Sequence, residues 1–379
     1  PNTDVALIMA LAFHLDESKL VNNQFLEKYT VGYQKFIDYV RGKKDGIAKN
    51  ARWASGITGV NEKIIRDLIL QISDAKRTMI SVSWSLTRQD HGEQPFWAAI
   101  TFACMLGQIG LPGGGIGFGY SAVNSMGNNF NNIRGASVPQ GINNIKSFIP
   151  VARISEMLEK PNQPFEYNGS TYNYPDIKLI YWAGGNPFHH HQDLNRMIKA
   201  WQKPETIICN EWCWNSLAKH SDIILPCTTA LERNDIMISP RDPYVVYMEK
   251  VLEPVGNSKT DFDIFCGLAK ELGFLEKYSL NKSEEEWIKW IYEETKTRQN
   301  DQSFFPNYKN FIEKKWFKIP NPREPKLLLN DFIRDPAAHP LKTPTGKIEI
   351  FSEKIEGFNY SDCKGHAAWF EPVEYKKKS

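Results

Sequence analysis

The pattern of apolar and polar residues in the first third of the chain predicts mostly helix. A helix is expected from Asp4 to about Leu15, apolar nearly all round and therefore buried, with Thr3 as its N-cap. A second helix is expected to begin at Asn61, because its apolar residues form one stripe: Ile64, Ile65, Leu68, Ile69 and Ile72. A third helix should be opened by Pro95 and end near Gln108.

Between and after these helices, three segments show strand, glycine and loop patterns. Residues 77–85 (RTMISVSWS) predict a buried strand, followed by a polar stretch. Residues 110–119 (GLPGGGIGFG) do not match G-x-G-x-x-G and follow a helix, so we interpret them as a close-packed connection and not as a phosphate cradle. Residues 124–145 predict an Asn-rich loop, of a length that is often functional.

A regular alternation of strands and helices begins at residue 176. Strands are predicted at 176–184, 206–211 and 221–227, and helices at 191–201 and 213–220. This order predicts a parallel sheet with helices on its faces. Further along, the pattern predicts an extended segment at 243–251, helices at 259–272 and after Ser283, and a Pro-rich irregular end.

Composition places the chain among ordinary soluble proteins of two or three lobes. It has 379 residues, of which 41% are hydrophobic and 24% charged, and a net charge of +2. This charge gives no reason to expect nucleic acid as a partner, and no apolar stretch is long enough to span a membrane. The start at PNTDVAL, without Met or signal peptide, is interpreted as the interior of a longer protein.

The six cysteines do not suggest a metal cluster. None forms a C-x-x-C pair, so an iron–sulfur or zinc framework is unsupported, and buried thiols are expected. They are Cys104, Cys209, Cys213, Cys227, Cys266 and Cys363.

Candidate chemistry gathers in residues 181–197 (YWAGGNPFHHHQDLNRM), after the first strand of the alternation. His189, His190 and His191 are consecutive, so they point about 100° apart on a helix and to opposite faces on a strand. They cannot easily share one ion, and no Cys or acidic cluster stands beside them. The remaining interpretations are a solvated polar turn and a loop that binds a phosphate or nucleotide.

The position of this loop favours a ligand, because parallel sheets bind ligands beyond the carboxyl ends of their strands. Gly184 and Gly185 permit positive φ and close backbone approach, and the following helix would offer its first N–H groups to an anion. Asn210 and Glu211 end the second strand, about where an acidic residue reads a ribose. Arg233, after the third strand, is free to meet a phosphate or base. We therefore expect Gly185, Asn186 and Glu211 at one edge of the sheet.

Five segments together resemble the molybdopterin oxidoreductases of the dimethyl sulfoxide reductase family. They are SWSLTRQDHGEQPFW, MLGQIGLPGGGIGFG, YWAGGNPFHHHQDLNRM, SDIILPCTTALERND and TPTGKIEIFSE. The resemblance runs from Pro1 to about Tyr375 and is nearest the branch of trimethylamine N-oxide, dimethyl sulfoxide and biotin sulfoxide reductases. It implies an α/β fold of parallel, Rossmann-like layers with helices on both faces, molybdenum bis(molybdopterin guanine dinucleotide) as cofactor, and reduction of an N-oxide or S-oxide.

The resemblance further implies that the chain is a central fragment, inactive alone. The serine that ligates molybdenum is expected upstream, so no catalytic or metal-binding residue is assigned, and a C-terminal domain is expected after residues 369–375. Residues 1–76 would belong to a first α/β domain, 77–275 to the Rossmann-like dinucleotide-binding domain, and 276–379 to a helical and irregular extension. Relatives imply a cytochrome c or quinol-linked electron donor and export to the periplasm, with the biotin sulfoxide branch cytoplasmic.

The resemblance assigns cofactor contacts to two segments near the start of the chain. Asn2, Thr3 and Asp4 match the segment that contacts one guanosine. Trp84 and Arg88 match positions that line a pterin, where a flat aromatic ring and a planar guanidinium suit a fused ring system. Alternatively, Trp84 is plain core, and Arg88 pairs with Asp90 or Glu93.

The other contacts implied by the resemblance fall on the alternating region. Asn186, His190 and Gln192, beside the close-approach Gly185, match the segment contacting the other pterin dinucleotide. Asn210 and Glu211 match its ribose-reading pair, although many relatives have Asp at the second position.

Arg233 and Asp261 match further nucleotide contacts, and Asp261 has a local alternative as a helix cap. Two other functions stay open: a nucleotide-binding or assembly module without turnover, and an NAD-type dehydrogenase. The missing G-x-G-x-x-G counts against the dehydrogenase.

Overall fold

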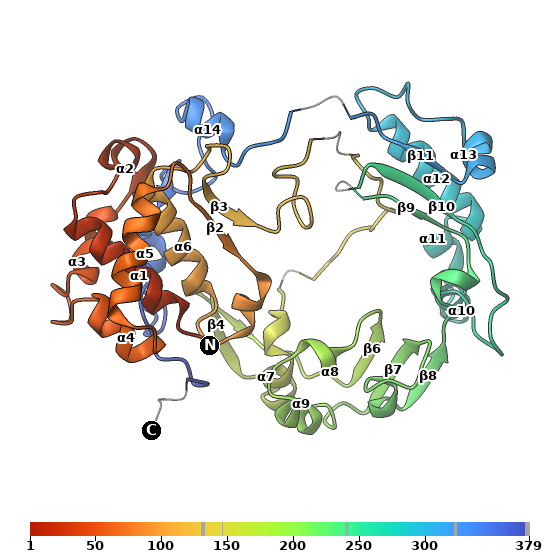
Figure 1. Cartoon of the computed structure of the whole chain (residues 1–379). Coiled ribbons are helices and arrows are strands. Elements are labelled where there is room, and N and C mark those ends of the chain that lie inside the picture. The colour runs from red at the N-terminus through yellow and green to blue at the C-terminus, as the bar shows by residue number, and fades with distance from the viewer. Residues whose placement is uncertain (130–132, 146, 240–241, 322–323, 376–379) are drawn as a thin grey trace. The chain divides into compact units, whose positions relative to one another are not determined.

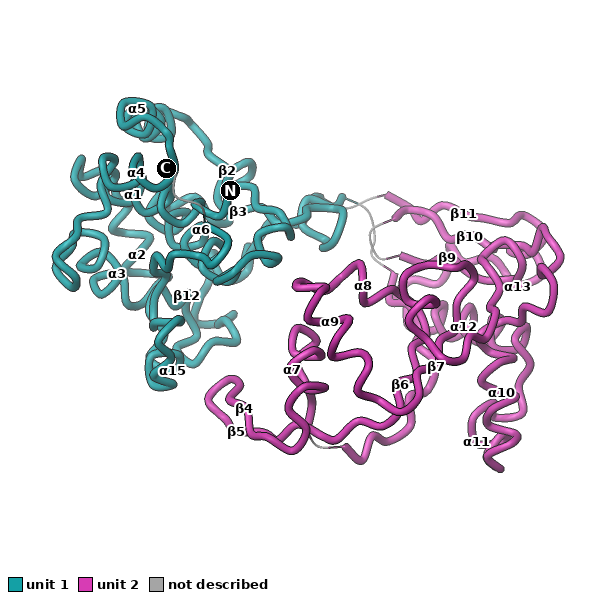
Figure 2. The backbone as a smooth tube through the Cα atoms, turned by 90° about the horizontal axis from the view of Figure 1, so that it is seen from below, with its two compact units in different colours: residues 1–129, 324–379 teal, residues 130–323 magenta. Residues whose placement is uncertain are grey.

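The structure is a computed structural model that describes residues 1–129, 133–145, 147–239, 242–321 and 324–375. The chain forms two compact units (Figure 2): residues 1–129 with 324–379 make up unit 1, and residues 130–323 make up unit 2. Unit 1 thus combines the two ends of the chain. Unit 2 contains the whole strand–helix alternation.

Unit 1 is mainly helical, with two short parallel strand pairs (Figure 1). Strand β1 pairs with β12, and β2 pairs with β3. Its helices are α1 (Asp4–Glu17), α2 (Asn23–Tyr29), α3 (Tyr33–Val40), α4 (Ala51–Thr58), α5 (Glu62–Asp74), α6 (Glu93–Leu106), α14 (Asn330–Arg334) and α15 (Glu353–Glu356), with a 3-10 turn η1 (Trp84–Arg88). Its strands are β1 (Thr30–Val31), β2 (Met79–Val82), β3 (Gly115–Phe118) and β12 (Ile348–Glu349).

One core holds unit 1 together, and it explains where the unit ends. Helices α1 and α6 are both apolar nearly all round, and residues such as Met9 and Ala98 are fully buried in the same cluster. Phe332 and Ile350 from the end of the chain join them. Residues 77–129 therefore share a core with residues 1–76, and the compact units do not divide at the predicted boundary of 76 and 77.

Several local predictions in unit 1 need correction. Thr3 precedes α1 but its side chain makes no capping hydrogen bond. Ile64 is 59% exposed, so the buried stripe of α5 reduces to Ile65 and Ile69. Strand β2 is not buried: its residues alternate between exposed and half-buried, because among the described residues it pairs with β3 alone.

The glycine-rich segment is closely packed, as predicted. A Cβ added to Gly110 would lie 2.7 Å from Ile333 Cγ1, and one added to Gly115 would lie 2.8 Å from Ile109 Cα. Both glycines also have positive φ. The sequence prediction missed that Gly115–Phe118 forms strand β3.

Unit 2 contains the predicted sheet and two smaller strand groups. Strands β6 (Leu179–Ala183), β7 (Thr206–Glu211) and β8 (Ile223–Pro226) form a parallel sheet in that order; β9 (Asp235–Met237), β10 (Tyr244–Met248) and β11 (Trp316–Lys318) form an antiparallel sheet; β4 (Pro164–Tyr167) and β5 (Ser170–Asn173) form a hairpin. The helices are α7 (Ile154–Glu159), α8 (Pro187–His190), α9 (Leu194–Ala200), α10 (Asp261–Glu271), α11 (Leu275–Ser279), α12 (Glu284–Thr297) and α13 (Tyr308–Lys314). Three 3-10 turns are η2 (Val151–Arg153), η3 (Ala218–His220) and η4 (Ala230–Glu232).

Helices cover both faces of the parallel sheet, which confirms the predicted architecture. On one face, Trp182 and Cys209 join a core with Met197 of α9. On the other face, the ring of Tyr181 lies 5.4 Å from that of Phe265 in α10. Because successive residues of a strand point to opposite faces, Tyr181 and Trp182 separate in this way.

This alternation differs from the prediction in the exposure of one strand and in the extent of both helices. Strand β6 is half-exposed, because it is the edge strand next to β7. The predicted helix at 191–201 is shorter, since α9 runs from Leu194, which is 40% exposed, to Ala200, and residues 187–190 form a separate short helix, α8. The predicted helix at 213–220 reduces to the single turn η3.

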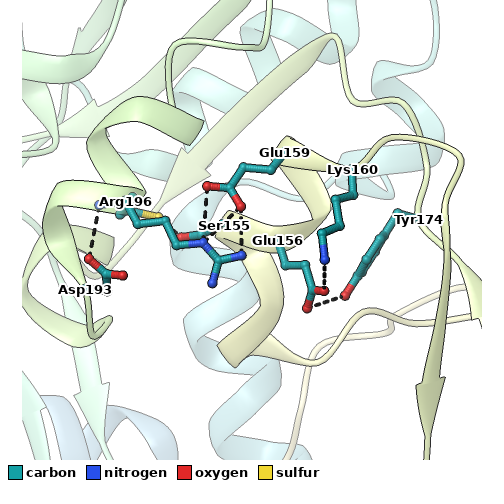
Figure 3. A network of polar contacts seen from close by, with 8 residues as sticks. Ser155, Glu156, Glu159, Lys160, Tyr174, Asp193 and Arg196 are labelled. Carbon is teal, nitrogen blue, oxygen red and sulfur yellow. Dashed lines mark hydrogen bonds and ion pairs between the residues drawn. The ribbon is translucent and has the colours of Figure 1, made fainter. Parts of the chain in front are cut away.

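A polar network fixes α7 against α9 (Figure 3), on the face of the sheet that carries Trp182 and Cys209. Arg196 reaches from α9 to Glu159 of α7, with Nε 2.9 Å and Nη2 2.7 Å from Oε2. One turn earlier in α7, Glu156 accepts from Lys160 at 2.9 Å and from the Tyr174 hydroxyl at 3.0 Å. The network holds in place the helix that follows the histidine loop.

Candidate functional site

Three chain segments meet at the carboxyl edge of the parallel sheet. In the register, Ala183 pairs with Asn210 and Glu211 pairs with Pro226. The glycine loop that follows β6, the Asn210–Glu211 end of β7 and the start of the loop after β8 therefore lie at one edge. This confirms the prediction that Gly185, Asn186 and Glu211 share an edge.

The two glycines of the loop are needed for backbone conformation. Gly184 has φ +80° and Gly185 has φ +74°, values that favour glycine. No heavy atom lies within 4 Å of a Cβ added to either. The space above both is thus open to a ligand, and the loop is braced by Trp182, whose Nε1 donates to Gly184 O at 2.9 Å.

Asn186 closes the loop and has one unused donor. Its Oδ1 accepts from Phe188 N at 3.0 Å and so caps α8. The residue is 8% exposed, and no described residue forms a hydrogen bond with its Nδ2. An unsatisfied buried amide is uncommon, and it marks a place where a ligand acceptor would fit.

The expected anion site at a helix N-terminus stays a prediction. Helix α8 has four residues, and Asn186 already caps its first turn. Helix α9 is capped in turn by Asp193, whose side chain accepts from Arg196 N. Each cap occupies one N–H group of its helix, and the glycine loop and the Asn186 amide are further donors at this edge.

The histidine run lies on the surface of the loop. His189 and His190 are exposed at the end of α8, and Gln192 is exposed between the two helices. Burial, followed by the charge of His190, lowers the pKa of His191. Among the described residues no group of three His, Cys, Asp or Glu side chains could hold a metal ion.

Asn210 connects the sheet to α10. It is 3% exposed; its Oδ1 accepts from the Tyr181 hydroxyl at 2.7 Å, and its Nδ2 donates to Asp261 Oδ1 at 2.8 Å. Asp261 is therefore not the N-cap of α10, a role taken by Thr260, but a partner of Asn210. Two residues that were assigned to the nucleotide site separately are brought into direct contact.

Glu211 supports the loop that follows β7. It is 8% exposed; its Oε1 accepts from Trp212 N at 3.0 Å, and its Oε2 accepts from Asn215 Nδ2 at 2.6 Å. Each carboxylate oxygen can accept a further bond, so a ribose hydroxyl can still be read. The Glu side chain, one methylene longer than Asp, has the reach to make both contacts.

The charged residues assigned to the nucleotide converge around Cys227, just after β8. Burial raises the pKa of the Cys227 thiol to about 11, helped by the negative charges of Asp261 and Glu211 and opposed by the positive charge of Arg233. Arg233 is not free as predicted, since its Nη2 lies 3.2 Å from Asp235 Oδ2. That pair still leaves guanidinium donors for a phosphate.

Sequence reasoning missed three residues of this edge. Thr228 is 4% exposed and its hydroxyl has no partner. Tyr181 and Asn215 hold Asn210 and Glu211 in place. The position of Thr228 as a polar residue soon after β8 could have marked it as a candidate. The contacts of Tyr181 and Asn215 could not be predicted, because they depend on the strand register and on the path of the loop.

The cofactor contacts assigned to unit 1 form two groups. Asn2 has φ +62°, Thr3 is half-buried, and Asp4 is exposed in the first turn of α1. Trp84 is 55% exposed, so it is not plain core. Arg88 is exposed, and none of its described neighbours forms an ion pair with it.

Trp84 lines a pocket at the carboxyl ends of β2 and β3. The pocket has a volume of about 490 Å³ and is largely apolar. The Trp84 and Phe118 rings meet edge to face at 5.6 Å, and Phe96 meets Phe118 in the same way at 5.6 Å. A flat ring system fits between such walls.

The thiols differ from one another in exposure. Cys104 and Cys209 are buried as expected, whereas Cys213 is exposed, and all six are free. No described helix has the length and apolar character that a bilayer crossing requires.

Comparison with known proteins identifies the family. A model of the family "Molybdopterin oxidoreductase" matches residues 3–271, so the chain belongs to the molybdopterin oxidoreductases. Membership implies a molybdenum–pterin cofactor, and the resemblance found from the motifs is confirmed.

Individual relatives narrow the group. The chain is 42% identical over 381 residues to a biotin sulfoxide reductase of Cereibacter sphaeroides. The matched region covers 100% of this chain and 51% of that protein. It is also 42% identical over 392 residues to a trimethylamine-N-oxide reductase of Haemophilus influenzae, and the matched region covers 98% of this chain and 47% of that protein. The chain spans about half the length of the curated relatives it matches.

A solved structure gives the same fold. Acetylene hydratase from Pelobacter acetylenicus matches with a TM-score of 0.63 at 16% identity, over 98% of this chain and 50% of that one. At this identity the likeness establishes the fold alone.

Proposed function

We propose that this chain is the central part of a molybdenum oxidoreductase that reduces an N-oxide or S-oxide, and that the edge of the β6–β7–β8 sheet holds a molybdopterin guanine dinucleotide. The similarity to reductases of biotin sulfoxide and trimethylamine N-oxide, across nearly the whole chain, supports the reaction class. The observation that carries the site is the meeting of Gly185, Asn186, Asn210 and Glu211 at one carboxyl edge.

The residues present fit such a group. Two buried polar atoms at this edge, Asn186 Nδ2 and Thr228 Oγ1, lack partners among the described residues. The open space over Gly185 admits a ligand. The carboxylates of Glu211 and Asp261 can accept from ribose hydroxyls or from a guanine edge.

Each part of the edge has a different role toward the bound group. The glycine loop and Asn186 would hold a pyrophosphate by backbone and amide N–H groups, and Arg233 would add a charge-assisted contact. When bound, the cofactor supplies the oxygen-atom and electron transfer, and the protein supplies binding and orientation. The chain's own contribution is thus to fix the cofactor in one position.

The remaining features of the proposal rest on the family resemblance and on the fraction of the relatives' length that this chain covers. A second dinucleotide would be held through Asn2, Thr3, Asp4, Trp84 and Arg88 of unit 1. The molybdenum ligand would come from the half of the relatives' length that this chain does not cover. The electron donor would be a cytochrome c or a quinol-linked protein, and the location the periplasm. A nucleotide-binding module without turnover is the alternative function for these residues alone.

The test compares the full-length protein with the 379-residue chain in a host that makes the cofactor. Molybdenum is measured by mass spectrometry, guanine as GMP after acid release, and turnover as oxide-dependent oxidation of a reduced viologen. The full-length protein is expected to contain molybdenum and guanine and to turn over, and the chain alone to be inactive. A full-length protein without pterin or guanine would refute the proposal.

Arg233→Ala in the full-length protein tests the site itself. Losing one charge-assisted contact should cost roughly 1.5–3 kcal/mol of binding and lower guanine content more than thermal stability. Arg298→Ala is the matched control, because Arg298 also forms an ion pair in unit 2, with Glu294 on α12. Equal guanine content in both variants would contradict the assignment of Arg233.

A further inference from the structure

Two tryptophans stand exposed directly after the central strand of the parallel sheet. Trp212 is 66% exposed and Trp214 is 73% exposed, in the loop that follows Glu211. Large aromatic side chains are usually mostly covered, because their surface is costly to leave in water. Two exposed tryptophans, separated by one residue on a short loop, indicate a surface that a bound group covers.

The loop that bears them is held rigidly. Glu211 accepts from Trp212 N and from Asn215 Nδ2. Asn215 in turn accepts from Ala218 N at 3.0 Å and donates its own N–H to the Cys213 carbonyl at 2.9 Å. The tryptophans are therefore presented by an ordered backbone, and binding to them costs little additional ordering of the chain.

The surroundings of the loop point to a nucleotide. Strand β7 lies between β6 and β8, so its loop emerges between the open glycine loop and Thr228. Asn186 and Thr228 have buried polar atoms without partners, and Asp261 faces the same edge through Asn210. Polar groups for a phosphate and sugar thus lie beside flat apolar surfaces for a base.

We propose that Trp212 and Trp214 form the stacking surface for the purine base of the dinucleotide, an inference that rests on the proposed function. Every base has a π-face that stacks on an aromatic ring, so the tryptophans would supply affinity with little base selectivity. Selection of guanine would come from carboxylate oxygens, which accept from its N1–H and 2-amino groups; adenine has no donor at N1.

The variants are Trp212→Ala, Trp214→Ala and the double alanine variant of the full-length protein, with both Phe variants to retain a stacking ring. Trp316→Ala is the matched control, because Trp316 is 55% exposed on β11 of the same unit. The side chains are exposed, so urea unfolding should be unchanged within about 0.5 kcal/mol in all variants. Comparison at equal stability separates loss of binding from loss of folding.

Two readouts are used: GMP released per protein from material made in a cofactor-producing host, and binding of added radiolabelled GMP to cofactor-free protein by equilibrium dialysis. The double alanine variant is expected to bind GMP roughly 5- to 100-fold more weakly and to retain less guanine. The Phe variants should stay within about threefold of the unsubstituted protein, and Trp316→Ala should match it.

The outcomes separate this inference from the function beneath it. Unchanged GMP affinity and guanine content in the double alanine variant, with guanine present in the parent protein, would overturn the stacking surface and leave the proposed function standing. A parent protein with no guanine and no affinity for GMP would overturn both. Loss in the Phe variants as large as in the alanine variants would also overturn stacking as the cause.

Discussion

Asn210 offers the sharpest test of the contacts at the sheet edge. Its amide Nδ2 donates to Asp261 Oδ1 at 2.8 Å while Oδ1 accepts from Tyr181 at 2.7 Å, and the residue is 3% exposed. Asn210→Asp changes one NH₂ to an oxygen with almost no change in volume. It keeps the acceptor for Tyr181 and places two carboxylates against each other.

The size of the effect follows from two limits. Two negative charges at 2.8 Å repel by about 6 kcal/mol at an effective dielectric constant of 20, and by less here because Asp261 is exposed. The penalty also cannot exceed the cost of protonating one carboxyl, about 4 kcal/mol at pH 7 for an ordinary pKa near 4. A loss of about 2–4 kcal/mol in the free energy of unfolding is therefore expected at pH 7.

The sign of the pH dependence is determined by the same coupling. In the folded variant one carboxyl has a raised pKa, so the folded state binds a proton that the unfolded state releases. The penalty is absent below the unfolded pKa near 4 and grows by about 1.4 kcal/mol per pH unit above it, up to the folded pKa. At pH 5 the loss should be roughly 1–2 kcal/mol, well below the loss at pH 7.

Urea unfolding at pH 5 and pH 7 measures this for four proteins: the parent, Asn210→Asp, Asp261→Asn and the double variant. In the double variant the hydrogen bond is reversed, so most of the loss should be recovered. A loss below about 0.5 kcal/mol, or one equal at both pH values, would mean that the two side chains do not meet. The hydrogen bond that joins Asn210 of β7 to Asp261 of α10 would then be refuted.

Three further outcomes are expected. Thr228→Val and Thr101→Val each replace a buried hydroxyl that has no described partner by a methyl group, so both should leave the stability of the cofactor-free protein unchanged or raised. Only Thr228→Val should weaken GMP binding, roughly 2- to 10-fold. Equal GMP binding in the two variants would argue against a ligand at Thr228. Glu159→Gln should cost about 0.5–1 kcal/mol in urea unfolding by removing the half-exposed ion pair with Arg196, and a loss of the same size in 1 M salt would show that charge is not the cause. Burial raises the pKa of Tyr39 to about 12, so the contribution of Tyr39 to stability should be constant below pH 10 and fall as the pH rises toward 12. In urea unfolding across that range, Tyr39→Phe should lose stability less steeply than the parent protein.

Local pattern was sufficient for much of the fold. The strand at 206–211 was predicted with the bounds that β7 has, and the strand–helix alternation predicted a parallel sheet with helices on both faces. A strand whose neighbours in sequence are helices must return in the same direction to pair, so the order of elements alone determines which loops share an edge. The placement of Gly185 and Glu211 follows from this.

The identity of the cofactor was inferred from the sequence motifs, and the assignment of cofactor contacts to individual residues stays a prediction. Asn2, Trp84, His190 and Gln192 were assigned by resemblance, and nothing in their contacts tests those roles. Gly184 and Gly185 are different: their positive φ angles are observed, and the open space over them agrees with the predicted approach of a ligand.

Tertiary structure alone decided which residues meet and which stay exposed. The contact between Asn210 and Asp261 spans 51 positions in the sequence, and the unit boundaries depend on α6 sharing a core with α1. Periodicity reports which face of an element is apolar, but it carries no information about the element that covers that face. For the same reason the sequence predicted β6 as buried, and it could not distinguish the exposed Trp212 and Trp214 from core residues of the same type.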